Sequence, residues 1–475
     1  MQILVDSQIE NVVKEVMKKA SLPIIVFIII IIIFLGCCFS YNDYITDDAF
    51  ISLQYAKNLK AGFGLSFNPG EKSYGFTSPL WIFILSILPF PAFAKTMSIF
   101  LGALSIGLFY LLCKEITEDH WSTLIATFIF ATDPWYIRWA SSGMETSLSI
   151  FFMLAGVFLF RKKNGFFPVF MGLATLSRPE IALLSIILFL FQNGKDAVKS
   201  FFVYSFIIVP YLIFSYRYFG TILPNTFLSK HGFIYFSCFI YSVITGGKII
   251  VGTYFLELFF IIALCVKKWQ KQFLLPILWC FLLFFFYAVG GMRMQSRYLL
   301  LLTPFIVLWG FMGMQMFLKR KVYIPALLLI ILNSYLWLGL NRPACIKFAQ
   351  GTKECFIPIG EWIKENTEKD AIIGVIDIGV IGYYSEREIL DLGGLVSKEM
   401  IPLLRKYDLQ EIIDKSLFES VKEMDYLVYR EREPIRLKGR YIPLYYRYHP
   451  RLGLSDPVGW YYSIYRVARN EQPHF

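Results

Sequence analysis

Two adjacent carboxylates, Asp47 and Asp48, are the residues of this sequence best placed to do chemistry. They follow the first long apolar run and open an amphipathic segment. A carboxylate at a membrane–water boundary is partly desolvated, and a second carboxylate beside it raises the pKa of one of the two. One of them could then accept a proton from a hydroxyl group while the other orients the molecule that carries it. The alternative is that Thr46 or Asp47 caps a helix whose first turn carries an acid.

Two further polar positions stand at breaks between apolar runs. Glu145 follows Gly143, which permits a tight turn, and would open the next helix at its positive end. Arg178-Pro179-Glu180 separates two short apolar runs. Helices that break at membrane depth usually line a cavity, and a charged side chain at the helix centre costs about 2.5–3.5 kcal/mol on insertion scales. We therefore expect Arg178, Glu180 and Glu145 to bind substrate. The alternatives are a satisfied Arg–Glu pair and an ordinary helix start at Glu145.

Basic residues beside the apolar runs predict an anion site. Lys230 follows Asn225 in one polar segment, and Arg293 and Arg297 lie in another. Arginine binds phosphate as a bidentate fork and lysine as a point charge, so these residues suit a lipid phosphate; the alternative is that they snorkel to the membrane interface. The sequence has no glycine-rich phosphate loop and no nucleophile elbow, and its four histidines are dispersed. We therefore expect no metal site and no cofactor.

The composition places these residues in a polytopic membrane protein. Of the 475 residues, 56% are hydrophobic and only 17% are charged, against about 25% charged in soluble domains. This excludes a soluble enzyme, a disordered chain and an ordinary nucleic-acid-binding protein. The net charge of +11 does not indicate a polyanion partner, because residues 341–475 hold equal numbers of basic and acidic side chains and the excess lies beside the apolar runs.

About eleven apolar runs are predicted to span the membrane. The first follows Lys14, Lys18 and Lys19, which places the N-terminus in the cytoplasm, and we expect it to be a retained anchor. Basic clusters at 161–163, 195–199, 267–271 and 319–321 then all fall on the cytoplasmic side. Residues 79–92 are short and punctuated by prolines, so we expect a re-entrant or interfacial segment. The predicted spans are residues 22–40, 94–113, 121–137, 145–160, 165–177, 180–192, 200–216, 248–266, 273–290, 298–318 and 322–340.

The chain divides by composition into a membrane module, residues 1–340, and an extracytoplasmic domain, residues 341–475. The second part has the pattern of a small α/β domain, with strands expected at 371–377, 388–392 and 426–430 and helices at 359–367, 397–406 and 408–423. Cys345 and Cys355 are close enough in sequence to pair if this tail lies outside the cell. The other outward-facing segments are the first outer loop, residues 41–93, and residues 138–144, 217–247 and 291–297.

Taken together, these segments resemble the membrane glycosyltransferases of the C-type fold (GT-C). The likeness is greatest to the mycobacterial terminal arabinofuranosyltransferases and their bacterial relatives. It spans almost the whole chain and rests on the order and spacing of short blocks, none of which is specific alone. The blocks are 47–56 (DDAFISLQYA), 67–70 (FNPG), 143–146 (GMET), 178–180 (RPE), 224–226 (PNT), 297–298 (RY), 377–379 (DIG), 382–384 (GYY) and 391–395 (DLGGL).

The resemblance implies a multi-pass enzyme of the cytoplasmic (inner) cell membrane that moves a sugar from a polyprenyl-phosphate donor to an extracytoplasmic glycan or glycolipid. Transfer would invert the anomeric centre, usually without a metal ion. Asp47 or Asp48 would be the base, and Glu145 would hold the acceptor or the donor sugar. Relatives often carry an acid after the Gly-Gly pair, where this chain has Met292 and Arg293, so sugar or acceptor recognition at that point is in question.

Two other functions remain open at the level of sequence. Intramembrane charges and broken helices also suit a transporter or flippase for lipid-linked glycans. A ligase or polymerase that uses polyprenyl-diphosphate glycans would differ in its donor. The large first outer loop with its acid pair and the folded tail favour the transferase.

Overall fold

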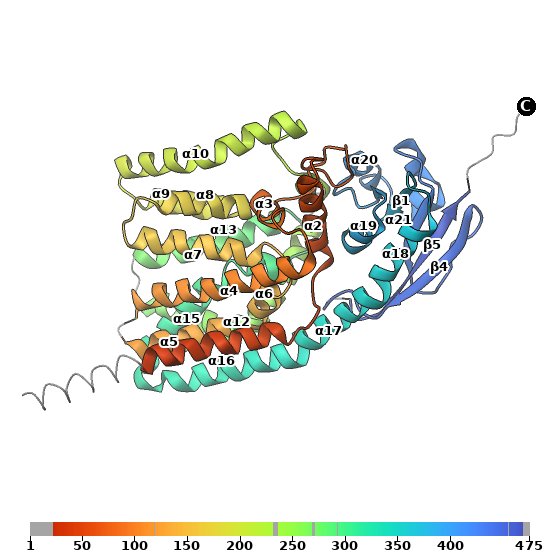
Figure 1. The fold of residues 1–475 in the computed structure, drawn as a ribbon. Helices are drawn as coiled ribbons and strands as arrows, with labels where there is room; N and C mark the ends of the chain where they lie inside the picture. Colours follow the sequence, from red (N-terminus) through yellow and green to blue (C-terminus); the bar gives the residue numbers. More distant parts are fainter. Residues whose placement is uncertain are drawn as a thin grey trace, which may run out of the picture.

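The computed structural model describes residues 22–117, 119–230, 236–267, 271–291, 293–454 and 456–468. A helical bundle carries a small sheet domain at one end, and α2 lies between the two (Figure 1). The basic flank Lys14, Lys18 and Lys19 lies outside the described residues. The turns after α7 and α15, which carry the basic clusters 161–163 and 319–321, lie at the end of the bundle away from the sheet domain.

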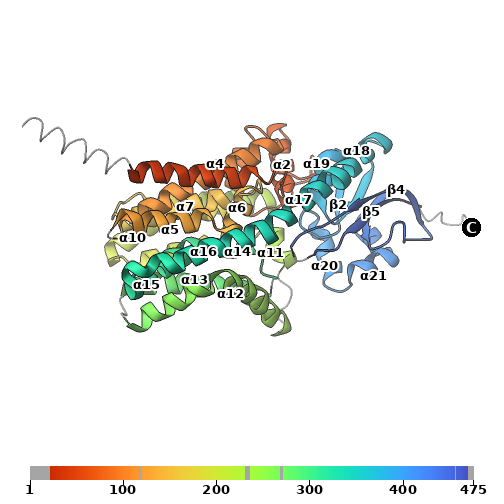
Figure 2. The same ribbon diagram turned by 90° about the horizontal axis from the view of Figure 1, so that it is seen from below.

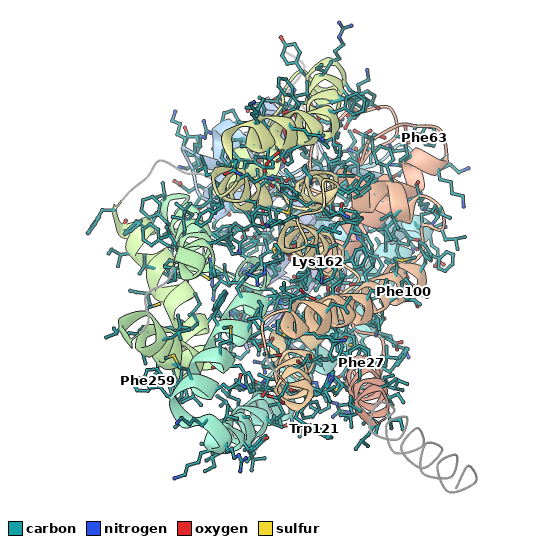
Figure 3. The ribbon with its side chains drawn as sticks, turned by 90° about the vertical axis from the view of Figure 1, so that its left-hand side faces the viewer. Phe27, Phe63, Phe100, Trp121, Lys162 and Phe259 are labelled. Atoms are coloured by element: carbon teal, nitrogen blue, oxygen red, sulfur yellow. The ribbon has the colours of Figure 1, made fainter. Side chains whose placement is uncertain are left out.

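Within the described residues, five helical stretches are long and apolar enough to cross a membrane by length and composition, and five shorter apolar helices accompany them. Exposed aromatic side chains such as Phe100 and Phe259 lie at the periphery of the bundle, as expected for a lipid-facing surface (Figure 3). Lys162 lies on the end of the bundle that faces the viewer in Figure 3. The fold is therefore the polytopic helical class that the sequence predicts. The five long stretches are Leu22–Phe39, Pro91–Lys114, Gly194–Phe219, Phe236–Val266 and Thr303–Asn366.

The helices between the first span and the sheet domain range in length from 4 residues in α14 to 32 residues in α12. In chain order they are α2 (Asp47–Lys60), α3 (Pro79–Leu85), α4 (Pro91–Lys114), α5 (His120–Ala131), α6 (Pro134–Ala140), α7 (Thr146–Arg161), α8 (Phe167–Ser177), α9 (Ile181–Leu190), α10 (Gly194–Phe219), α11 (Asn225–Lys230), α12 (Phe236–Lys267), α13 (Lys271–Val289), α14 (Ser296–Leu299), α15 (Thr303–Leu318), η1 (Lys319–Val322) and α16 (Tyr323–Tyr335).

The segment 79–92 does not span the bundle, as predicted. Its helix α3 has 7 residues, which at 1.5 Å per residue gives a length of only about 10 Å. The predicted span 121–137 is divided into α5 and α6. Asp133 caps α6 by accepting the backbone N–H of Tyr136 at 2.8 Å, and Pro134 at the first position cannot continue the preceding helix.

The segment 217–247, which we expect to face outward, includes the first part of α12, because this helix begins at Phe236. Within α12, Gly246 permits close packing. A Cβ there would lie 2.3 Å from the sulfur of Met294 and 2.8 Å from the ring of Phe284. The helix is kinked at Tyr254, whose hydroxyl donates to Asp133 at 2.9 Å.

The last span continues into the sheet domain without a break. After α16 the chain stays helical through η2 (Leu336–Asn341), α17 (Arg342–Gly351), η3 (Thr352–Phe356) and α18 (Ile357–Asn366). The composition changes at residue 340, but the helix is not interrupted there. Cys345 and Cys355 are both buried free thiols, and ten residues of one helix separate them by about 15 Å along its axis, too far for a disulfide.

The sheet domain has five strands in the order β2-β1-β3-β5-β4. The first three are parallel and match the predicted strands, and β5 and β4 continue the sheet antiparallel. The elements after α18 are β1 (Ile372–Val375), α19 (Ile378–Ser385), β2 (Glu388–Asp391), η4 (Lys398–Met400), α20 (Ile401–Leu404), α21 (Leu409–Asp414), η5 (Leu417–Ser420), β3 (Tyr426–Glu431), β4 (Tyr441–His449) and β5 (Trp460–Val467).

Both faces of this sheet are covered. Helices α18 and α19 lie on one side of the strands, and α20 and α21 lie on the other (Figure 2). The first side belongs to a hydrophobic core that is continuous with the bundle, whereas the second has a core of its own around Met400, Ile412 and Phe418. The sheet domain is thus built onto the bundle through shared apolar packing.

Candidate active site

A cavity of about 520 Å³ lies where the bundle, the first outer loop and the sheet domain meet. The breaks between helices are gathered here: the start of α2, the turn before α7, the α8–α9 break and the short α14 all reach it. Its polar lining includes Asp48, Glu145, Arg178, Glu180, Tyr287, Arg297 and Tyr298, and Leu395 comes from the sheet domain. Residues far apart in sequence therefore converge on one cavity.

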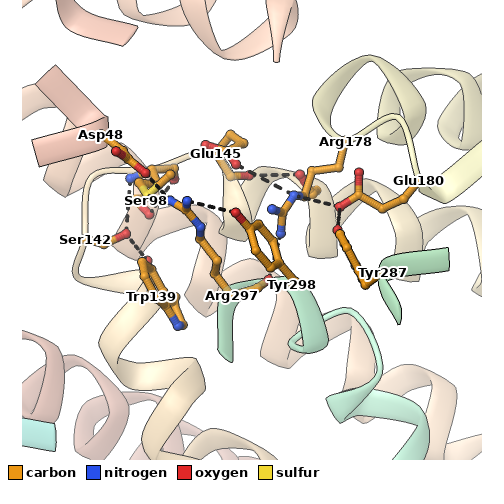
Figure 4. Close-up of polar contacts among 12 residues, drawn as sticks. Asp48, Ser98, Trp139, Ser142, Glu145, Arg178, Glu180, Tyr287, Arg297 and Tyr298 are labelled. Carbon is orange, nitrogen blue, oxygen red and sulfur yellow. Dashed lines mark hydrogen bonds and ion pairs between the residues drawn. The ribbon is translucent and has the colours of Figure 1, made fainter. Parts of the chain in front are cut away.

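Asp48 lies at the start of α2 and forms an ion pair with Arg297 of α14 (Figure 4). The Asp48 side chain is 43% exposed, whereas that of Arg297 is 9% exposed. The guanidinium is fixed by Tyr298, whose hydroxyl lies 3.1 Å from Nη2, and by the sulfur of Met144 at 3.5 Å. A neighbouring cation favours the ionised form of a carboxylate, which is the form that accepts a proton.

Arg178 holds the second group of charges in the cavity. It is 6% exposed, and its Nε lies 3.1 Å from Glu180 and 3.7 Å from Glu145. Its Nη1 donates to the backbone carbonyl of Arg297 at 2.7 Å, which ties the α8–α9 break to α14. Glu180 also accepts the hydroxyl of Tyr287, and the rings of Tyr287 and Tyr298 stack at 4.9 Å.

These contacts complete a row of side chains along one wall of the cavity (Figure 4). Carboxylates and guanidinium groups are respectively strong acceptors and donors of hydrogen bonds to hydroxyl groups. The predicted Arg178–Glu180 pair therefore exists as an ion pair, and it also lines the cavity.

Asp47 points away from this cavity. Its carboxylate accepts the backbone N–H groups of Gly379 at 3.1 Å and Val380 at 2.8 Å, at the start of α19. Burial and the nearby Asp377 carboxylate raise the pKa of Asp47 to about 7, against the opposing effect of the two N–H donors. Neither acid caps α2, since Thr46 is the N-cap residue and makes no capping hydrogen bond with its side chain.

The remaining predicted residues do not join the row. Asn225 is buried and donates its backbone N–H to Tyr74 at 2.8 Å, while its neighbours Pro224 and Thr226 line the cavity. The side chain of Lys230 lies outside the described residues. Arg293 is exposed and does not line the cavity, because α14 begins only at Ser296 and the loop before it carries Arg293 outward. Of the three basic residues of the expected anion site, Arg297 is the one whose described side chain lines the cavity, where it is accompanied by Arg178, which was not expected in that site.

Among the lining residues that were not predicted as site residues are Tyr287, Tyr298 and Leu395. Tyr298 and Leu395 appear in the sequence analysis only within blocks that carry the resemblance. Tyr287 lies inside a long apolar run. A tyrosine buried in such a run usually has a hydrogen-bond partner for its hydroxyl, and this is the sequence signal that could have indicated a polar site there. Among the described residues, no group of three or more His, Cys, Asp or Glu side chains could hold a metal ion.

Comparisons with known proteins agree on the architecture. A family model for a domain of unknown function (DUF8728) matches residues 345–468, which is the sheet domain with the helix leading into it. No curated protein matches the sequence. Similar solved structures include the apo oligosaccharyltransferase of Archaeoglobus fulgidus, with a TM-score of 0.58 and 13% identity over 86% of this chain and 69% of that one.

Two further structures were solved with lipid phosphates. ArnT from Cupriavidus metallidurans bound to undecaprenyl phosphate has a TM-score of 0.55 and 12% identity over 92% of this chain and 97% of that one. The archaeal oligosaccharyltransferase AglB from Archaeoglobus fulgidus, in complex with an inhibitory peptide and a dolichol-phosphate, has a TM-score of 0.54 and 11% identity over 85% of this chain and 69% of that one. The chain therefore has the fold of the GT-C membrane glycosyltransferases.

Proposed function

We propose that this protein is a membrane glycosyltransferase that moves a sugar from a polyprenyl-phosphate donor to a glycan or glycolipid acceptor. The observation that carries the proposal is the Asp48–Arg297 pair at the edge of a cavity lined by acids, arginines and tyrosines. Structures of the same fold contain undecaprenyl phosphate and dolichol-phosphate, which supports a lipid-linked donor. The likeness to terminal arabinofuranosyltransferases remains part of the proposal, as does a pentose or hexose as the sugar.

In this proposal Asp48 is the general base. The acceptor hydroxyl lies between Asp48 and the anomeric carbon of the sugar, and the carboxylate takes its proton as the oxygen attacks. The lipid phosphate leaves from the opposite side of the ring, so the configuration inverts. A phosphate ester needs little protonation to leave, and the guanidinium group of Arg178 offsets the charge that develops on it.

Glu145 and Glu180 bind the sugar in this proposal and do not act as the base. Both are held by Arg178 at the side of the cavity, where their remaining oxygen lone pairs can accept hydrogen bonds from sugar hydroxyls. Tyr287 and Tyr298 present stacked rings beside them, and such faces suit the apolar side of a sugar ring. We place the protein in the cytoplasmic membrane with the cavity and the sheet domain on the extracytoplasmic side.

Surface-glycan mass spectrometry on a deletion strain of the source organism tests the proposal. The wild-type gene should restore one missing sugar mass, and Asp48→Asn should lower that product at least about 100-fold, since a positioned base contributes about 10²–10⁴ in rate. Asp43→Asn is the matched control, because Asp43 is an exposed acid of the same loop that does not line the cavity.

Two results would contradict the assignment. Full rescue by Asp48→Asn would remove Asp48 as the base. A glycan profile that does not change on deletion, together with altered movement of lipid-linked glycans across the membrane, would replace transfer with transport.

A further inference from the structure

The parallel half of the sheet turns its usual ligand-binding edge toward the bundle. From β1 the chain crosses to β2 on one side, and β3 lies on the other side of β1. Open α/β sheets bind ligands at the carboxyl ends of their strands where the strand order reverses in this way, and the N-terminus of the following helix attracts anions. Here that helix is α19, which follows β1.

The acceptor at this position is an acidic side chain of the same protein. The Asp47 carboxylate receives the N–H groups of Gly379 and Val380 at 3.1 and 2.8 Å. The approach is so close that a Cβ on Gly379 would lie 2.0 Å from the backbone oxygen of Asp47. A backbone atom cannot swing aside as a side chain does, so the fit requires glycine at 379.

Other polar contacts join the same two parts of the chain. Asn68 exchanges two hydrogen bonds of 2.9 Å with the backbone of Ile389, which pairs the exposed edge of β2 as another strand would. Tyr383 of α19 donates to the carbonyl of Pro89 at 3.0 Å, and Lys57 of α2 pairs with Glu386 at 3.1 Å. The first outer loop is thus docked along α19 and β2, and Leu395 from the same domain reaches the cavity wall.

We propose that Asp47 is a positioning residue, which anchors the start of α2 to α19 and so fixes Asp48 in the cavity. The inference rests on the proposed function of Asp48. Asp47 and Asp48 are consecutive in one helix, so a shift of the Asp47 backbone moves Asp48 with it. Misplacing a catalytic group by about 1 Å can cost about 100-fold in rate.

Hydrogen–deuterium exchange of the purified full-length protein in detergent tests the docking without any substrate. The peptide covering 378–385 should be protected in the wild type and in Asp48→Asn, and should lose protection in Asp47→Ala. Asp47→Asn should keep most of the protection, because its amide oxygen still accepts a backbone N–H. Unchanged protection in Asp47→Ala would overturn the docking.

The glycan assay tests the consequence for Asp48. Asp47→Ala and Gly379→Ala should lower product about 100-fold, and Asp47→Asn should stay within about threefold of wild type. Gly453→Ala is the matched control, because an added Cβ there meets nothing within 4 Å. If Asp47→Asn abolishes product as fully as Asp48→Asn does, Asp47 acts chemically and the positioning role is wrong. If even the wild type makes no product, the proposed function fails, and the exchange data still decide the docking.

Discussion

At the residue scale, two adjacent carboxylates have different surroundings because successive residues of a helix point about 100° apart. Asp48 faces the cavity and Arg297, whereas Asp47 faces the N-terminus of α19. The acid pair could be recognised from the sequence, but which of the two carboxylates faces the cavity could not. The partner of Asp47 lies 332 residues later in the chain, and the bond depends on how the sheet domain docks.

The Arg178 cluster gives a stability prediction at the same scale. Arg178→Ala would leave Glu145 and Glu180 without their buried cation, and removing one partner of a buried pair costs about 3–5 kcal/mol. We expect a lower free energy of unfolding for Arg178→Ala, seen as earlier thermal unfolding in detergent. Arg178→Lys should lower the free energy of unfolding by less, because lysine keeps the positive charge although it lacks the planar guanidinium group.

Arg293→Ala is the matched control for this measurement, because Arg293 is an exposed arginine that does not line the cavity. Equal unfolding temperatures for Arg178→Ala and Arg293→Ala would mean that the cluster contributes little to folding. It would then be retained for substrate contact alone.

At the element scale, the docking of α2 on α19 should depend on pH. Asp47 has a pKa of about 7 when docked, above the ordinary 3.8, so protonation favours the docked state. The docking is strongest below about pH 4 and weakens as the pH rises to about 7. The charged groups that face Asp47 are Asp377 and Asp48, both acidic. Their repulsion of an ionised Asp47 also increases as the pH rises.

This dependence can be measured by exchange of the 378–385 peptide between pH 4 and pH 8, corrected for the intrinsic pH dependence of exchange. Wild-type protection should fall as the pH rises, and Asp47→Asn should abolish most of that fall. A protection that rises with pH in the wild type would show that the two N–H donors dominate over burial.

The elements with strong local signals were predictable, and those set by distant contacts were not. Strands β1 to β3 carry continuous apolar runs, and prolines mark α3 as too short to span. Strands β4 and β5 are rich in tyrosine and were not predicted. Pro443 argues against a central strand, but β4 is at the edge of the sheet, where proline is tolerated.

At the scale of the whole molecule, the basic clusters 161–163 and 319–321 lie at one end of the bundle and the sheet domain lies at the other. The positive-inside rule then assigns the basic end to the cytoplasm. In intact cells, a membrane-impermeant maleimide should label Lys369→Cys in the sheet domain and should label Lys162→Cys only after permeabilisation. Both positions are exposed, and the unsubstituted protein gives the background. The reverse pattern would invert the topology and place the cavity inside the cell.

The unbroken helix from Tyr323 to Asn366 has a mechanical consequence. At 1.5 Å per residue it is about 66 Å long, and a hydrocarbon core of about 30 Å covers less than half of it. The rest of the helix, which includes the π-helical segments Leu336–Asn341 and Thr352–Phe356, connects the span to the sheet domain. When a thinner or thicker bilayer tilts the last span, the sheet domain must tilt with it and carry Leu395 and the α19 anchor along. We therefore expect bilayer thickness to affect the alignment of the first outer loop with the sheet domain, and the same protein should transfer sugar at different rates in short-chain and long-chain lipids.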